Sequence, residues 1–152
     1  MSAAAVQAKR AEGMAHLTFA VDCALTQHLA GSVFLLEHPA AVTSRQTREL
    51  QDLGSCAGVY SVLFDQCMTG LVSPCSRTPM RKHTKLMSNS KHFVEAFRGD
   101  MCDQSHFHKF IQGSEGGIRL SVWCQCYPAP IVNLLVGGGQ SGARGASEAF
   151  PE

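Results

Sequence analysis

The expected fold rests mainly on Val33-Phe-Leu-Leu-Glu-His-Pro39, a short apolar run that ends in a carboxylate, an imidazole and a proline. A continuous apolar run closed by proline is typical of a buried strand. Phe64-Asp-Gln-Cys-Met-Thr-Gly-Leu71 and the basic run Arg81-Lys-His-Thr-Lys85 follow it along the chain. Open α/β sheets bind ligands at the carboxyl ends of their strands, so these polar residues predict part of a site.

Composition predicts one intracellular domain. The chain has 152 residues, 45% hydrophobic and 16% charged, which is enough for a core that folds without disulfides. A formal charge of +1 argues against a general polyanion binder. We find no apolar stretch long enough to span a bilayer and no basic segment followed by a long apolar one at the start, so we expect an intracellular protein.

Hydrophobic periodicity predicts helices that alternate with strands, between two termini without order. Apolar residues at steps of three and four indicate helices, and short apolar or alternating runs indicate strands. A capping box of Thr43 and Gln46 is expected to open the second helix, and Ser90 the third. The expected order is a flexible extension 1–13, helix 14–29, strand 33–37, helix 43–53, strand 59–64, loop 65–83, strand 84–87, helix 90–101, strand 118–122, helix 128–136 and a disordered Gly/Ser-rich tail 137–152.

This alternation predicts an α/β domain over residues 14–136. We expect a partial Rossmann-like sheet of about four strands flanked by helices, because strands that alternate with helices favour a sheet covered on both faces. No Gly-x-Gly-x-x-Gly follows a strand, so the sequence shows no nucleotide cradle.

Five segments carry a resemblance when they are taken in order: Gly31-Ser-Val-Phe-Leu-Leu-Glu-His-Pro-Ala40, the stretch 64–71, Met80-Arg-Lys-His-Thr-Lys-Leu-Met-Ser-Asn89, Cys102-Asp-Gln-Ser-His-Phe-His108 and Tyr127-Pro128. Together they resemble a domain of retroelement-type polyproteins, which is similar to the second half of S-adenosylmethionine-dependent cytosine methyltransferases. In such enzymes a strand ends in Glu-Asn-Val. The resemblance implies that Glu37 is the counterpart of its base-contacting glutamate, and that Glu37 and Asp65 line an ancestral catalytic cleft.

The same resemblance implies an incomplete methyltransferase-like fold without independent catalysis. The glycine-rich cofactor turn and the Pro-Cys nucleophile of the family would lie upstream of Met1, so we expect no bound cofactor unless a partner chain supplies the missing half. Cys75 follows a proline, but it comes after Glu37 rather than before it, and we interpret it as a loop cysteine.

Cys102, His106 and His108 form a candidate zinc site. Histidines two positions apart on an extended segment point the same way, and a cysteine before them supplies a third ligand. The fourth ligand is expected from Cys124, Cys126 or His92. Seven cysteines, irregularly spaced, do not suggest a disulfide framework, and we interpret Cys23, Cys56 and Cys67 as thiols in or near the core.

A basic cluster forms a candidate nucleic-acid contact, because cations can hold phosphates and no acidic residue lies between Asp65 and Glu95. Its members are Arg77, Arg81, Lys82 and Lys85, with His83 and Lys91 beside them. Three functions therefore stay open. The chain is a catalytically incompetent methyltransferase-like fragment from a mobile element, a small metal-stabilised module that binds DNA or RNA, or a translated fragment without function.

Overall fold

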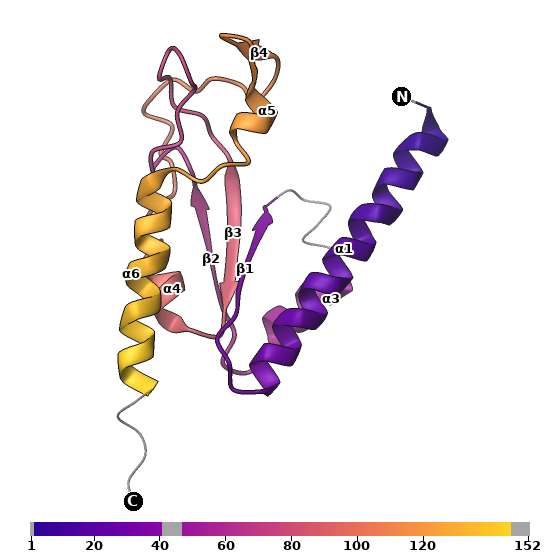
Figure 1. The fold of residues 1–152 in the computed structure, drawn as a ribbon, viewed down its shortest axis with the longest axis vertical. Coiled ribbons are helices and arrows are strands. Elements are labelled where there is room, and N and C mark those ends of the chain that lie inside the picture. The colour runs from indigo at the N-terminus through magenta and orange to yellow at the C-terminus, as the bar shows by residue number, and fades with distance from the viewer. Residues whose placement is uncertain (1, 41–46, 147–152) are drawn as a thin grey trace, which may run out of the picture.

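The structure is a computed structural model that describes residues 2–40 and 47–146 (Figure 1). It is a mixed α/β fold with a small antiparallel sheet and helices on either side. The elements in chain order are α1 (Ala3–Leu29), β1 (Leu35–Pro39), α3 (Arg48–Ser55), β2 (Tyr60–Asp65), β3 (His83–Ser88), α4 (Lys91–Glu95), β4 (Ser114–Glu115), β5 (Ile118–Arg119), α5 (Leu120–Trp123) and α6 (Ala129–Ala146).

The main sheet has three strands in the order β1-β3-β2, and both neighbouring pairs are antiparallel. Leu86 in β3 lies opposite Glu37 on one side and Val62 on the other. Because β1 and β2 both run against β3, they are parallel to each other and α3 makes the crossover between them. The strands expected at 33–37, 59–64 and 84–87 are confirmed within a few residues. β3 runs antiparallel to both of its neighbours, however, whereas a Rossmann-like sheet is mostly parallel.

The fourth expected strand, over residues 118–122, is wrong. Only Ile118 and Arg119 are extended, in a two-stranded hairpin with β4, and the chain then turns into α5. Leu120 is buried and Val122 is exposed, so the alternation that suggested a strand was produced by a short helix with one buried face.

Successive residues of β3 point to opposite faces of the sheet and so build two cores. On one face, α1 and α3 pack on Met87, and the buried residues of this core are Val21, Ala24, Phe34, Leu50, Leu53 and Met87. On the other face, α4 and α6 pack on Leu86, and the buried residues are Phe64, Leu86, Phe97 and Ile131. Figure 1 shows the two helix pairs on opposite sides of the strands.

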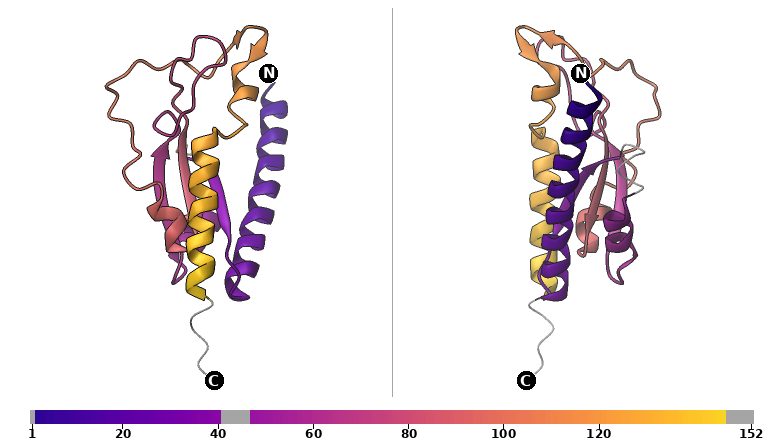
Figure 2. Two further views of the ribbon diagram at one scale, coloured as in Figure 1. Left: turned by 60° about the vertical axis from the view of Figure 1, so that its left-hand side comes forward. Right: turned by 90° about the vertical axis from the view of Figure 1, so that its right-hand side faces the viewer.

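The two long loops, over residues 66–82 and 96–113, extend to the end of the sheet where β1 and β2 terminate, as the two further views in Figure 2 show. The expected loop over residues 65–83 is confirmed, apart from one isolated bridge between Val72 and Pro79. Leu71 and Met80 from this loop pack on α5 through Leu120 and Cys124, and so form a third, smaller core. This end of the molecule therefore has little regular backbone and few buried apolar side chains.

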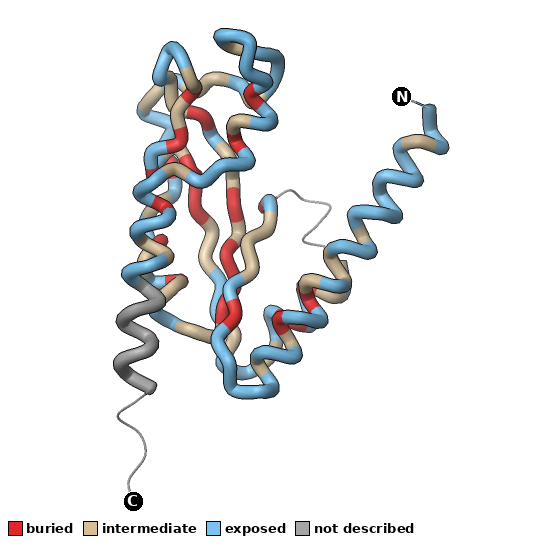
Figure 3. Tube along the Cα trace, in the orientation of Figure 1, coloured by how far each residue is buried: buried red, intermediate tan, exposed pale blue. Residues whose placement is uncertain are grey.

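Both terminal helices are longer than the sequence predicted. α1 begins at Ala3 rather than at Met14. The Ser2 hydroxyl caps it by accepting a hydrogen bond from the Ala5 N–H, and most of the first half of the helix is exposed (Figure 3). α6 continues to Ala146 instead of ending near Val136, so residues 137–146 of the expected disordered tail are helical. The capping box of Thr43 and Gln46 lies outside the described residues. In the described part of the chain, no helix combines the length and the apolar character that crossing a membrane requires.

Candidate metal centre

A tight turn at the end of β2 positions Cys67. The Met68 N–H donates to the Asp65 carbonyl and the Leu71 N–H to the Gln66 carbonyl, so the chain reverses directly after the strand. Asp65 and Gln66 are fully buried, and the Gln66 amide donates to the Thr84 hydroxyl at 3.0 Å. These contacts hold the Cys67 thiol at the carboxyl end of β2.

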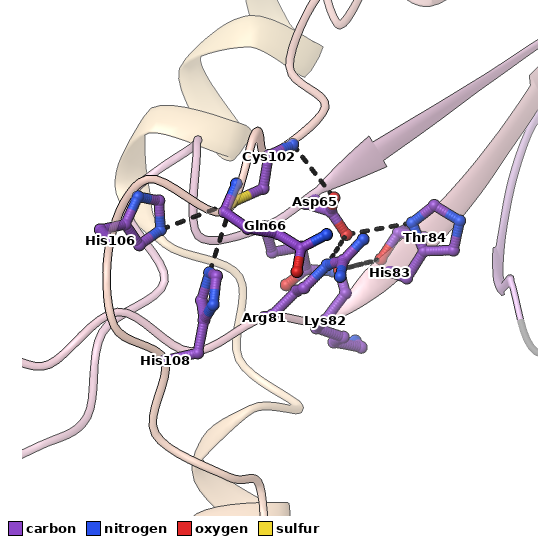
Figure 4. Close-up of polar contacts among 10 residues, drawn as sticks. Asp65, Gln66, Arg81, Lys82, His83, Thr84, Cys102, His106 and His108 are labelled. Atoms are coloured by element: carbon purple, nitrogen blue, oxygen red, sulfur yellow. Dashed lines mark hydrogen bonds and ion pairs between the residues drawn. The ribbon is translucent and has the colours of Figure 1, made fainter.

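The loop after α4 brings three further donor side chains to the same place. Its start is held by the Asp65 N–H, which donates to the Asp100 carbonyl, and its end by the Lys109 N–H, which donates to the Pro79 carbonyl. Between these points, Cys102 is buried, and His106 and His108 are half-buried with ring centroids 4.5 Å apart. Figure 4 shows both imidazoles directed toward Cys102.

The four donor atoms have the spacing of a tetrahedral metal site. Ligand atoms of Cys67, Cys102, His106 and His108 all lie within 4.8 Å of one another. The Cys102 sulfur is 3.7 Å from His106 Nε2 and 3.4 Å from His108 Nε2. Tetrahedral zinc with bonds of about 2.3 Å to sulfur and about 2.0 Å to nitrogen requires sulfur–nitrogen separations of about 3.5 Å. The two distances from Cys102 match this requirement, so the cluster can hold a metal ion once its remaining donors close in.

Backbone contacts and burial act on the protonation of the candidate ligands. The Gln104 N–H donates to the Cys102 sulfur at 3.3 Å, a contact that favours a thiolate, and Gln104 adopts a left-handed φ of 63° to make this turn. Burial, together with the neighbouring Cys102, raises the pKa of Cys67 to about 12, so a metal ion would have to displace the proton of this thiol to bind it. Burial also lowers the pKa of His108, which keeps the imidazole in its neutral, ligating form.

Asp65 ties the cluster to the sheet. Its carboxylate accepts hydrogen bonds from the Cys102 N–H at 3.1 Å and from Arg81 Nε at 3.0 Å, and it contacts His83 Nδ1 at 3.0 Å. Burial alone would raise the pKa of this carboxyl, but the bonds from Arg81, Cys102 and His83 hold it below its usual value. Asp65 therefore stays ionised and orients the segment that carries Cys102, as outer-shell carboxylates do in metal sites.

The structure brings together the three candidate ligands predicted from the sequence, and the fourth candidate in the cluster is Cys67. Cys124 is buried beside Leu120 in the third core, and Cys126 is exposed. Cys67, interpreted as a thiol in or near the core, is half-buried and belongs to this cluster, whereas Cys23, interpreted in the same way, is exposed. A usable signal was present, since Cys67 comes two residues after Asp65 at a strand end, where the sequence already placed a site.

The basic cluster is partly neutralised by acidic residues that are distant in sequence. Arg81 pairs with Asp65, and Lys82 pairs with Glu37 at 3.7 Å while donating to the Cys124 carbonyl. The absence of acidic residues between Asp65 and Glu95 therefore does not leave this run without acidic partners. Arg77 is exposed in a left-handed turn and forms no ion pair with any described residue.

Glu37 and Asp65 do not share one cleft. Glu37 lies opposite Leu86 and Asp65 opposite His83, and β3 residues three positions apart point to opposite faces. Glu37 and Tyr127 line a small apolar cavity of about 190 Å³ between the sheet and α6. Cys75, in turn, is exposed in the loop and its N–H donates to Glu115.

Glu115 joins the hairpin of β4 and β5 to the 65–83 loop and should titrate abnormally. Bonds from Lys109, Ser76 and the Cys75 N–H lower its pKa from 4.5 to about 2. A depressed pKa means that these contacts contribute stability above about pH 4.5 and lose it as the pH falls toward 2. We expect a carboxyl NMR titration of Glu115 to have its midpoint well below 4.5. A midpoint near 4.5 would show that the loop does not hold this carboxylate.

Comparisons of this chain with family models, with curated proteins and with solved structures find no match.

Proposed function

We propose that this chain is a small binding module whose loops are held by a structural zinc ion on Cys67, Cys102, His106 and His108. The observation that carries the proposal is the convergence of these four donor atoms within 4.8 Å, from two segments that lie 35 residues apart at their nearest ligands. Two thiolates and two imidazoles are a set that zinc prefers. Four protein ligands fill a tetrahedral shell, so the role is structural.

The metal would supply stability where the fold has least of its own. The turn after β2 and the 102–108 segment lack regular secondary structure, and the core beneath them has four buried residues. In small metal domains the binding free energy of the ion is also folding free energy. Zinc would thus lock both loops onto the end of the sheet and present their outer surface in a fixed shape.

The methyltransferase-like ancestry is a second proposal. It is supported by the β1–α3–β2 crossover, which joins two parallel strands as the α/β resemblance implies. If only the half-domain is present, the purified chain should not bind S-adenosylmethionine in a calorimetric titration. Binding tighter than about 100 μM, or roughly 5.5 kcal/mol, would refute the half-domain proposal.

Metal analysis of the purified protein tests the zinc proposal. We expect about one equivalent of zinc, and a cobalt-loaded sample should show the absorption of tetrahedral cobalt with sulfur ligands. Replacing Cys67 by serine should reduce zinc content strongly, whereas His92→Ala, which changes a ligand that the sequence also suggested, should leave it unchanged. Less than about a tenth of an equivalent in the wild type, or full zinc content in Cys67→Ser, would refute this site.

A further inference from the structure

The loop after α4, which carries Cys102, His106 and His108, exposes two large aromatic side chains. Phe107 is 78% exposed and Phe110 is 82% exposed, although phenylalanine is normally buried. They line a groove of about 610 Å³ together with Arg81, Lys109, Gln104 and Gln112. Within the described residues, no acidic side chain lines this groove.

The metal ligands explain how the aromatic rings are presented. His106 and His108 lie edge to face and both contact the Cys102 sulfur, whereas Phe107 between them is exposed and lines the groove beside them. The Lys109 N–H donates to the Pro79 carbonyl, which holds the segment just before Phe110. Zinc binding would therefore fix both phenylalanines on a rigid support instead of on a free loop.

The polar side chains of the groove favour an anionic ligand. Asp65 accepts a hydrogen bond from Arg81 through Nε alone, and the side chain of Arg81 remains 37% exposed. The terminal nitrogens of its guanidinium form no hydrogen bond with any described residue and can donate to a phosphate. The amides of Gln104 and Gln112 add donors and acceptors of the kind that read base edges.

We propose that this groove binds single-stranded nucleic acid, with unpaired bases stacked on Phe107 and Phe110 and the backbone phosphate held by Arg81. Aromatic side chains can stack on bases only where these are not already paired, which is why exposed rings beside a cation favour single strands over a duplex. This inference rests on the proposed function, because the zinc site positions the two rings. It moves the contact from the predicted basic run to the loop after α4, with Arg81 the one residue shared.

Fluorescence anisotropy with labelled single strands of about 12 nucleotides tests the proposal, with oligouridine and oligothymidine as separate arms and a duplex of equal length as the competitor. We expect the zinc-loaded protein to bind at least one single strand with a Kd of about 10 to 100 μM at low salt. The duplex should bind more weakly. Replacing Phe107 and Phe110 together by alanine should weaken binding about tenfold or more.

Matched variants separate stacking from other effects. Phe19→Ala, which removes a ring that is 71% exposed on α1, should leave the affinity unchanged. Phe107→Trp should retain binding, and a double leucine variant should not, because leucine keeps apolar area but cannot stack. Zinc content is measured for each protein. Absence of zinc from the wild type would refute the proposed function, and this result does not depend on whether the groove binds oligonucleotides.

Three outcomes would overturn the proposal. The first is a zinc-loaded protein that binds no single strand at low salt, and the second is binding that the double alanine variant leaves unchanged. The third is a duplex that binds as tightly as either single strand. If sedimentation instead shows self-association that depends on Phe107 and Phe110, without oligonucleotide binding, the groove belongs to a second copy of the chain.

Discussion

Replacing Cys102 by serine is expected to release the zinc and to lower the Tm by about 10 °C or more. The Cys102 sulfur lies within 3.7 Å of both imidazole nitrogens, so it is the donor that contacts both histidines of the site. Structural zinc contributes about 10 to 16 kcal/mol of binding free energy in small domains, and a loss of only about 4 kcal/mol would produce this shift in a chain of this length. Differential scanning calorimetry with parallel zinc analysis measures both effects.

Cys126→Ser is the matched control for this experiment, because Cys126 is an exposed thiol outside the cluster. It should melt with the wild type and carry the same zinc. A chelator should lower the Tm of the wild type and of Cys126→Ser, and should have little effect on Cys102→Ser. If Cys102→Ser kept its zinc and its Tm, the ion would not be held by these residues.

Replacing Asp65 by asparagine is expected to reduce the free energy of unfolding by about 3 kcal/mol. Removing one partner of a buried charged network costs roughly 3 to 5 kcal/mol, and the partial exposure of Arg81 places the value near the lower end. Asparagine keeps the shape of the side chain but lacks the charge that Arg81 requires. Zinc affinity should also fall about 10- to 100-fold, because the Asp65 carboxylate orients the Cys102 backbone.

Asp52→Asn is the control for the Asp65 variant, since Asp52 forms a single ion pair with Arg48 on the surface. Their side chains are 68% and 90% exposed, and such pairs contribute about 0.5 kcal/mol or less. Because the pKa of Asp65 is depressed, its contribution is present above the ordinary carboxyl pKa and is lost as the pH falls through the folded value. Urea unfolding at neutral and acidic pH should therefore show that the free energies of unfolding of the wild type and of Asp65→Asn become equal in acid. Equal losses in both variants at neutral pH would contradict a central role for Asp65.

Local patterns predicted the elements that form the centre of the fold. The apolar runs before Pro39 and Asp65 became β1 and β2, and Thr84 to Met87 fell inside β3, because buried strands require such runs whatever their neighbours are. Strand order could not be predicted in the same way. Whether β3 lies beside β1 or at the edge of the sheet depends on which apolar faces meet, and no local period carries that information.

The candidate site shows the same division. The spacing of Cys102, His106 and His108 indicated three candidate ligands, because the local backbone conformation determines in which direction neighbouring side chains point. Cys67 was missed because an isolated cysteine next to an apolar strand has the same sequence signature as a core thiol. Likewise, the sequence shows no acidic residue between Asp65 and Glu95, but Asp65 in β2 and Glu37 in β1 pair with Arg81 and Lys82 in the folded chain.

Local sequence patterns were sufficient to predict the α/β class, the three strands of the main sheet, the long loop after β2 and three of the four candidate metal donors. The position of β3 between β1 and β2, the place of Cys67 in the candidate cluster and the exposure of Phe107 and Phe110 depend on tertiary packing. Hydrophobic periodicity is a local property, whereas strand order, ion pairing and the geometry of the cluster arise from side chains that meet only after the chain has packed.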